Sequence, residues 1–271
     1  MHAAPTSRRW RPTPLILATA PIHLAAVAVL VFAPAQWAWA IAAVALNHAA
    51  LTLAGLWPRS RLLGPNWTQL PAAAAARGEI AITIDDGPDP AVTPQVLDLL
   101  DAAGARATFF CIGERAAAQP ALVADILRRG HDVQNHSQLH RKTFSLFGPR
   151  RMAQDIAAAQ HTFARLTGRA PRFFRAPAGL RNPFLEPVLA RHGLTLASWT
   201  RRGFDTREGD ADTVLARLTR NLAGGDILLL HDGHAAHTRQ DRPVILEVLP
   251  RLLDAVRAAG LRPVTLTACL E

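Results

Sequence analysis

The chain has no Asp, Glu, Lys or Arg from Pro12 through Pro58. This uncharged run divides near Pro34 into two apolar segments, at about residues 14–33 and 37–57. A helix needs about 20 apolar residues to cross a bilayer, because the hydrocarbon core is about 30 Å thick and a helix rises about 1.5 Å per residue. Both segments are just long enough. The run therefore predicts an N-terminal hairpin of two transmembrane helices.

Two other interpretations of the uncharged run stay open. A signal peptide would explain the arginine-rich start, the first apolar segment and a cleavage site at Ala38-Trp39-Ala40, but it leaves the second segment unexplained. Two helices buried on a soluble domain would each have a polar face, and neither segment has one. We favour the hairpin, which with its basic flanks occupies residues 1–65, and we expect a second domain over residues 66–271.

Arginines flank both ends of the uncharged run. Arg8, Arg9 and Arg11 precede it, Arg59 and Arg61 follow it, and the connection between the two apolar segments has no charge. Loops rich in Lys and Arg stay on the cytoplasmic side of a membrane. The flanks therefore predict a protein of a bacterial-type inner membrane whose termini and larger domain face the cytoplasm. An extracytoplasmic domain is the alternative.

The overall charge and the cysteine count exclude several classes of protein. The net charge is +9, from 30 Lys and Arg against 21 Asp and Glu, but the flanking arginines account for much of the excess. No basic run interleaved with aromatic residues follows, so we expect no nucleic-acid partner. The 2 cysteines, Cys111 and Cys269, are too few for a disulfide framework or a four-cysteine metal site.

From about Gly78 onward, short apolar runs alternate with amphipathic helical patterns. The predicted strands are Ala81–Asp85, Ala107–Cys111, Asp132–Asn135, Arg172–Arg175, Thr195–Trp199, Ile227–Leu230 and Pro263–Leu266. The predicted helices are Thr93–Ala103, Pro120–Arg129, Pro149–Leu166, Pro183–His192, Ala211–Asn221 and Val244–Ala259. This alternation is typical of an α/β fold with parallel strands. An open doubly wound sheet and a barrel both fit it.

Two adjacent carboxylates, Asp85 and Asp86, follow the first predicted strand, and Gly87-Pro88 then turns the chain. Neighbouring residues of a strand point to opposite faces, so the two acids can serve different purposes. One can bind a metal ion while the other acts as a base. Asp residues are also common in turns and helix caps without any such role.

His136 and His140 are spaced to bind one cation, because side chains at i and i+4 share a face if the stretch is helical. With the Asp86 carboxylate they would form a two-histidine, one-carboxylate site. Zinc suits these ligands, and so do cobalt, nickel and iron. The alternative is a pair of exposed loop histidines. That is our interpretation of the remaining scattered histidines, which include His161, His192, His234 and His237.

Two further residues stand at predicted strand ends. His231 follows the apolar run Leu228-Leu229-Leu230, and Arg175 follows Phe173-Phe174. In an α/β barrel the carboxyl ends of the strands converge on one active site, so residues far apart in the sequence can meet there. A purely structural role for Arg175 is the alternative in a chain this rich in arginine.

Together these motifs resemble those of the polysaccharide deacetylase (NodB-homology) family. The motifs are Thr83-Ile84-Asp85-Asp86-Gly87-Pro88, His136-Ser137-x-x-His140, Arg175-x-Pro177-x-Gly179 and Leu228-x-Leu230-His231-Asp232, in the family's order. The similarity extends from about Gly78 to Leu266. It implies a distorted (β/α) barrel of about seven parallel strands, and metal-dependent removal of N- or O-linked acetyl groups from sugars.

The resemblance also implies a role for each motif residue. Asp85 resembles the general base, Arg175 the residue that orients this base, and His231 the general acid. Asp205 resembles the acid that holds that histidine charged. The metal ligands implied are Asp86, His136 and His140, and the loop that binds substrate and oxyanion is Pro177, Ala178 and Gly179. The family often has an aromatic residue at the position of Ala178 and a tryptophan at that of Thr206.

The leading hypothesis is a membrane-anchored deacetylase, dependent on a divalent metal such as zinc, that acts on an N-acylated amino sugar. Its substrate is either polymeric, which suits a domain outside the membrane, or lipid-linked, which suits a cytoplasm-facing domain beside the bilayer. The charge flanks favour the lipid-linked sugar. The alternative from another class is a catalytically inactive glycan- or lipid-binding membrane protein of the same fold.

Overall fold

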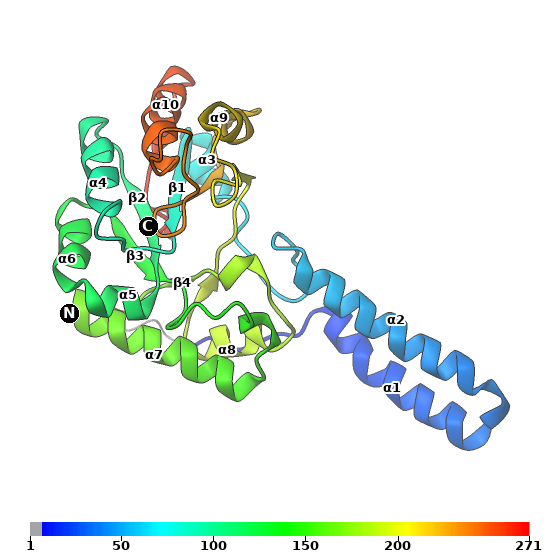
Figure 1. Ribbon diagram of the computed structural model, residues 1–271. Helices are drawn as coiled ribbons and strands as arrows, with labels where there is room; N and C mark the ends of the chain where they lie inside the picture. Colours follow the sequence, from blue (N-terminus) through cyan, green and yellow to red (C-terminus); the bar gives the residue numbers. More distant parts are fainter. Residues whose placement is uncertain (1–6, 271) are drawn as a thin grey trace.

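The computed structural model describes residues 7–270. Residues 1–6 of the predicted hairpin segment and Glu271 of the predicted second domain lie outside the described residues. Figure 1 shows a helical hairpin that projects from an α/β domain. The two parts are consecutive in the chain.

The hairpin consists of α1 (Pro14–Phe32) and α2 (Trp37–Leu56), joined by a 3₁₀ turn at Pro34–Gln36. Both helices are long and apolar enough to cross a membrane. Most side chains of α1 are uncovered, since only 6% of its apolar window is buried. Polar contacts join the two helices: Asn47 Nδ2 lies 3.4 Å from Thr19 Oγ1.

Parallel strands form the centre of the α/β domain. They are β1 (Glu79–Asp85), β2 (Ala107–Cys111), β3 (Asp132–Asn135), β4 (Phe173–Phe174), β5 (Thr195–Leu196), β6 (Arg201–Arg202), β7 (Ile227–His231) and β8 (Arg262–Pro263). Seven of them follow one another in the order β5-β4-β3-β2-β1-β7-β6, and β8 pairs with the start of β1. This arrangement confirms the predicted α/β class.

Helices pack around the sheet, most of them on its outer side (Figure 1). They are α3 (Ala72–Ala76), α4 (Thr93–Ala102), α5 (Gly113–Ala118), α6 (Pro120–Arg128), α7 (Pro149–Thr167), α8 (Leu185–Arg191), α9 (Ala211–Thr219) and α10 (Ile245–Ala258). Alternate residues of β1 pack on opposite faces: Ile82 joins the helix-covered core, whereas Ala81 joins an inner core with Phe110 and Leu229. Burial on both faces explains why the central strands are continuous apolar runs.

The sheet is strongly curled, as one side chain shows. β3 and β2 separate β4 from β1, which in a flat sheet would put them about 14 Å apart. Arg175, the residue after β4, nevertheless donates from Nη1 to Asp85 Oδ1 at 2.7 Å. It also donates to the carbonyl oxygens of Ala197 and Ser198, which join β5 to β6. The strands therefore curl around Arg175 into the predicted distorted barrel.

The short elements differ from the prediction. The strands expected at residues 172–175, 195–199 and 263–266 shrink to the two-residue strands β4, β5 and β8, and β6 was not predicted. Their pairing depends on neighbouring strands rather than on a local apolar run, so sequence periodicity locates them poorly. The helices α3 and α5 were also missed; each spans fewer than two turns, too short for a clear apolar stripe.

Candidate active site

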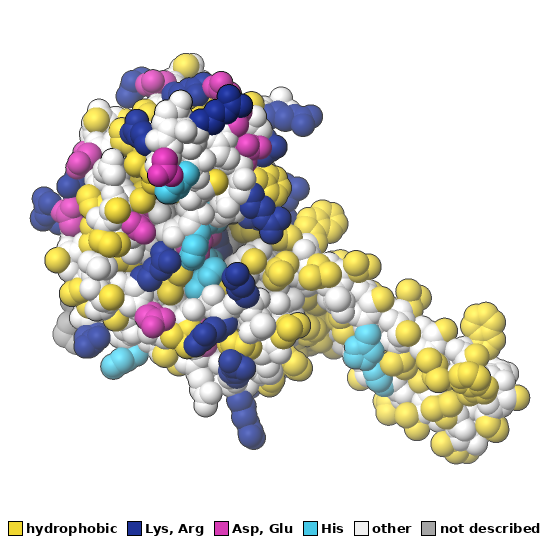
Figure 2. Space-filling view, viewed as in Figure 1, with side chains coloured by type: hydrophobic (Ala, Val, Ile, Leu, Met, Phe, Trp, Pro, Cys, Tyr) yellow, Lys and Arg dark blue, Asp and Glu magenta, His cyan; other side chains and the backbone are white. Residues whose placement is uncertain are grey.

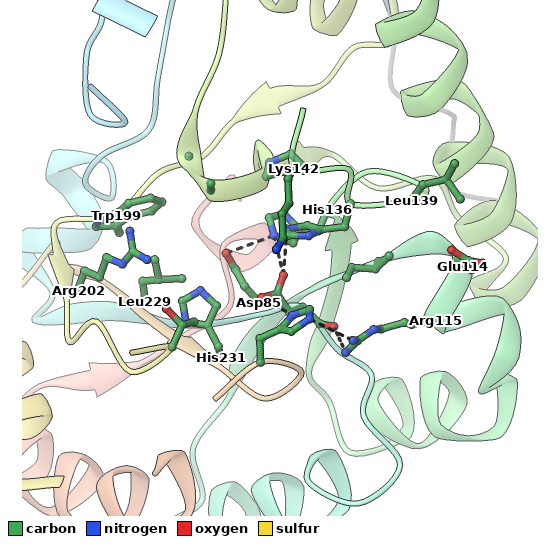
Figure 3. A pocket seen from close by; sticks show the side chains of 18 of the residues that line it. Asp85, Glu114, Arg115, His136, Leu139, Lys142, Trp199, Arg202, Leu229 and His231 are labelled. Carbon is green, nitrogen blue, oxygen red and sulfur yellow. Dashed lines mark hydrogen bonds and ion pairs between the residues drawn. The ribbon is translucent and has the colours of Figure 1, made fainter. Parts of the chain in front are cut away.

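A cavity of about 840 Å³ opens at the carboxyl ends of the strands. Asp85, Asp86, His136, His140 and His231 all line it. Figure 3 labels three of them, Asp85, His136 and His231. The residues come from β1, from the loop after β3 and from β7, so the sheet brings together groups that are far apart in sequence. This convergence confirms the expectation that the strand-end motifs meet.

Asp85, the predicted base, is held by a buried arginine. Arg175 donates from Nη1 to Asp85 Oδ1 at 2.7 Å and to Thr83 Oγ1 at 2.7 Å. Arg175 is 1% exposed, and its guanidinium carbon lies 4.1 Å from the ring centroid of Phe110. Asp85 Oδ2 is thereby directed towards the histidines, 3.7 Å from His136 Nε2. The structure places Arg175 where it fixes the orientation of Asp85.

Three side chains form a possible metal site. The ligand atoms of Asp86, His136 and His140 lie within 4.8 Å of one another. Asp86 Oδ1 is 3.3 Å from His136 Nε2 and 3.1 Å from His140 Nε2, and it has no hydrogen-bond partner among residues 7–270. His136 Nδ1 lies 2.9 Å from the Arg175 carbonyl oxygen, which leaves Nε2 for a cation. These residues fit a divalent metal ion.

The electrostatics of the three groups also suit a cation. Burial alone would raise the pKa of Asp86, but the neighbouring imidazoles of His136, His234 and His140 hold that pKa well below its ordinary value. Burial lowers the pKa of His140 to about 4, so its imidazole is neutral near pH 7, as a metal ligand must be. Burial alone would lower the pKa of His136, but the negative charges of Asp85 and Asp86 raise it above its ordinary value. A proton therefore competes with a cation for His136.

The stretch from His136 to His140 is a loop rather than a helix. Ser137 and His140 have positive φ angles of 68° and 47°. The Asn135 side chain accepts the Ser137 N–H at 2.8 Å, and the Ser137 hydroxyl accepts the His140 N–H at 2.9 Å. These local bonds compete with helix formation. The spacing predicted the proximity of the two histidines, but the helical reason for it was wrong.

His231, the predicted acid, lies directly opposite Asp85 in the register of β7 and β1. Its Nδ1 is 2.9 Å from Asp205 Oδ1, and its backbone N–H donates to Asp205 Oδ2 at 2.7 Å. Burial alone would lower the pKa of His231, but Asp205, with smaller contributions from Asp85 and Asp86, outweighs burial and raises it. Among residues 7–270, no hydrogen bond or ion pair engages the Nε2 atom, which leaves this atom available to a substrate.

The loop after Arg175 forms one wall of the cavity. Pro177–Gly179 is a 3₁₀ turn, and Pro177, Ala178 and Gly179 line the cavity. Ala178 is exposed and has φ 55°, a left-handed conformation that costs about 1 kcal/mol or more for a residue with a Cβ. Such strain is common where a backbone group is aimed at a ligand. Thr206 lines the same cavity.

The structure adds residues that the sequence did not single out. His234 lies in the site, because its Nδ1 is 3.1 Å from Asp86 Oδ2; our interpretation of it as a scattered loop histidine was wrong. Its position three residues after His231 was the available signal. Four cationic side chains also line the cavity: Arg115, Lys142, Arg202 and Arg207. Figure 3 shows Lys142 above His136 and Arg202 beside Trp199.

Comparison with known proteins agrees with this geometry. Residues 73–197 match the family model for polysaccharide deacetylase. Over 194 residues the chain is 36% identical to a peptidoglycan-N-acetylglucosamine deacetylase of Bacillus cereus, an alignment that covers 71% of this chain and 88% of that protein. The chain belongs to the polysaccharide deacetylase family.

Other members of this polysaccharide deacetylase family are similar over most of their length. A chitooligosaccharide deacetylase of Bradyrhizobium sp. is 33% identical over 156 residues, which cover 57% of this chain and 71% of that protein. The structure is also similar to that of a family 4 carbohydrate esterase from Streptomyces lividans in complex with acetate. The TM-score is 0.62 at 32% identity, over 69% of this chain and 91% of that chain.

Membership of the polysaccharide deacetylase family establishes the class of enzyme. The chain is a carbohydrate deacetylase, and enzymes of carbohydrate esterase family 4 depend on a metal ion. Asp86, His136 and His140 form the possible site for that ion. The structure brings every predicted site residue to the same cavity or, for Arg175 and Asp205, into direct contact with a residue that lines it.

Proposed function

We propose that this protein is a membrane-anchored deacetylase that uses zinc to remove an acetyl or similar acyl group from the nitrogen of an N-acylated amino sugar. The observation that carries this proposal is the convergence of Asp85, the Asp86-His136-His140 cluster and His231 on one cavity. The similarity to enzymes named for N-acetylglucosamine and chitooligosaccharide substrates supports an N-acetylated amino sugar.

The residues have complementary roles in this reaction. Asp86, His136 and His140 would hold a divalent metal ion, and that ion would supply a Lewis acid for the acyl carbonyl and a lower pKa for a bound water. Asp85, with Oδ1 fixed by Arg175, takes the proton of the attacking water on Oδ2. His231, with Nδ1 committed to Asp205, presents Nε2 and protonates the departing amine. The acid and the base thus stand on neighbouring strands, directly opposite each other in register.

The loop after Arg175 completes the proposed site. The backbone amide of Ala178 lies in a turn that lines the cavity, and we assign it the oxyanion of the tetrahedral intermediate. A side-chain change at this position leaves the amide in place. The small side chains of Ala178 and Thr206 leave a wider substrate-binding surface than aromatic residues would. Ring stacking therefore contributes less to the binding of a glycan.

An inactive glycan- or lipid-binding protein is the second candidate for this fold. Such a protein would need no base and no acid. Here the base is oriented by Arg175 and the acid by Asp205, both through buried charged contacts. Keeping two buried ion pairs is costly unless the groups are used, because desolvation offsets much of their attraction. The observation therefore favours the enzyme.

Two features support a membrane anchor rather than a cleaved signal peptide. Helices of 19 and 20 residues span about 29 and 30 Å, close to the thickness of the hydrocarbon core. The N-terminal flank is also part of the folded domain, since Arg8 pairs with the buried Glu186 and its N–H donates to the Ala190 carbonyl at 2.9 Å. Cleavage after Ala40 would remove Arg8. With both arginine flanks inside, the catalytic domain faces the cytoplasm.

The test is acetate release by the full-length protein in nanodiscs, measured with N-acetylchitooligosaccharides and after reconstitution with zinc, cobalt or nickel. We expect turnover by the wild type. We expect Asp85→Asn and His231→Ala to bind the same amount of metal while turnover falls by about two orders of magnitude or more. A wild type that binds metal but releases neither acetate nor formate from any N-acylated amino sugar would instead support the binding protein.

A further inference from the structure

A second cavity, of about 700 Å³, lies between the hairpin and the catalytic domain. We call it the hairpin cavity. Its walls are mainly apolar, with Ile16, Ala20 and Leu51 from the two helices and Leu146, Pro183 and Phe184 from the domain. Two histidines, His23 and His48, line its hairpin side and lie 3.2 Å apart through their Nε2 atoms. Nothing in the deacetylation chemistry requires this cavity.

The same two loops line the hairpin cavity and the active-site cavity. In the loop after β3, Lys142 lines the active site, whereas Ser145 and Leu146 line the hairpin cavity. Three residues of chain span at most about 11 Å. In the loop after β4, Gly179 lines the active site and Arg181 lines the hairpin cavity. The two cavities are therefore neighbours on either side of the loops.

The end of α2 is packed directly against the loop after β4. Arg181 N–H donates to the Gly55 carbonyl at 3.1 Å, and a Cβ on Gly55 would lie only 2.1 Å from the Arg181 carbonyl oxygen. A Cβ on Gly179 would lie 2.8 Å from Pro58. These close approaches fix the hairpin relative to the active site. If α1 and α2 lie in a bilayer, the active site stands at the membrane surface.

Exposed side chains of the domain beside the hairpin suit contact with lipid. Leu146 is 80% exposed and Phe184 is 46% exposed, although both are large and apolar. Figure 2 shows histidines in the hollow of the domain and on the hairpin on the same face of the molecule. Around the active site, Arg115, Lys142 and Arg202 provide positive charge for an anionic group. An apolar cavity next to a cationic one matches an amphiphile with an anionic head.

We propose that the hairpin cavity binds the hydrocarbon chain of a lipid-phosphate-linked, N-acylated amino sugar, while the sugar occupies the active site and the phosphate lies near Lys142. This inference rests on the proposed deacetylase function and narrows its substrate. Because the same two loops line both cavities, the cavities lie close enough for one molecule to fill both. The adjoining membrane helices favour a lipid chain over a peptide as the occupant of the apolar part.

The test uses the full-length protein in nanodiscs of phosphatidylethanolamine and phosphatidylglycerol. Two substrates carry the same N-acetyl sugar: a soluble N-acetylchitooligosaccharide and a polyprenyl-phosphate-linked N-acetylglucosamine with a diazirine in its chain. Ala20→Trp fills the hairpin cavity. Ala25→Trp is the matched control, since Ala25 is exposed on α1 but does not line the cavity. Leu146→Asp introduces a charge into the hairpin cavity from the side of the catalytic domain.

We expect light to crosslink the diazirine to α1, α2 and the segment around Phe184. Ala20→Trp and Leu146→Asp should each raise KM for the lipid-linked substrate by about tenfold, since lost apolar contact weakens chain binding. Neither should change turnover of the soluble substrate, and Ala25→Trp should change nothing.

The outcomes separate this inference from the deacetylase function. One outcome is that the protein releases acetate from the soluble sugar and that KM for the lipid-linked substrate is the same in all variants. This result would support the deacetylase function and overturn the lipid site. Crosslinking within the hairpin cavity without acetate release from either substrate would support the lipid site and overturn the deacetylase.

Discussion

Asp205 holds His231 at two points: Oδ1 lies 2.9 Å from the imidazole Nδ1, and Oδ2 accepts the His231 backbone N–H at 2.7 Å. One carboxylate thus fixes both the ring and the strand end that carries it. Asp205 is fully buried, so solvent does not screen the attraction between its charge and the imidazolium. This contact explains how a histidine that is 6% exposed keeps a raised pKa against burial.

Asp205→Asn should lower the pKa of His231, because the largest contribution that raises it disappears. The imidazolium is the proton donor, so activity falls as pH rises above that pKa. The alkaline limb of the pH profile of kcat should therefore move to lower pH, and kcat near neutral pH should fall by about 10- to 100-fold. Profiles measured for the two proteins check this, and an unchanged alkaline limb would contradict the assigned role of His231.

The sequence predicted the central part of the fold better than its edges. β2 and β3 match their predicted ranges, because each is a local run ending at a turn and buried on both faces. The two-residue strands β4, β5 and β6 owe their pairing to the curl of the sheet around Arg175. That curl depends on contacts between residues about 90 positions apart, which a local pattern does not contain.

The candidate site shows the same division between local pattern and distant contact. The motifs predicted Asp85, Asp86, His136 and His231, which stand at or directly after the end of a strand, and His140, which follows His136 by four residues. They do not show that the loop after β7 turns back over Asp86 and brings His234 to the carboxylate; the local signal for His234 is its position three residues after His231. The sequence could not predict the hairpin cavity either, because its walls come from the hairpin and from two separate loops.

Arg175 should be essential both to stability and to catalysis. Removing one partner of a buried ion pair leaves an uncompensated charge, so Arg175→Ala should lower the free energy of unfolding by about 3–5 kcal/mol. Arg175→Lys keeps the charge but loses the planar arrangement that reaches Asp85, Ala197 and Ser198 together. We expect the Lys variant to fold, to bind metal and to lose most of its kcat, as judged by thermal melts, metal analysis and acetate release. A Lys variant with normal kcat would show that the orientation of Asp85 does not depend on Arg175.

His234 should act through the metal site rather than directly on substrate. Its Nδ1 contacts Asp86 Oδ2, whereas the other two histidines approach Oδ1. A partner of this kind orients a ligand, and its loss typically weakens metal binding by about 10- to 100-fold. His234→Gln should therefore lose zinc to a competing chelator more readily than the wild type.

The matched control for this prediction is His237→Gln. His237 lies in the same loop and has similar exposure, 53% against 52% for His234, but it pairs with Asp241 away from the cavity. Equal zinc affinity in the two variants would show that His234 does not support the metal site.

The orientation of the hairpin can be tested at two exposed positions of the same chain. The arginine flanks predict that the turn at Pro34–Gln36 lies outside the inner membrane and that the catalytic domain lies inside. A recognition site for a specific protease can be inserted after Gln36, or, in a second variant, after Gln240 in an exposed loop of the domain. Protease added to intact spheroplasts should cut the first variant and spare the second, and lysis should expose both. Cleavage after Gln240 in intact spheroplasts would place the active site outside and favour a polymeric substrate.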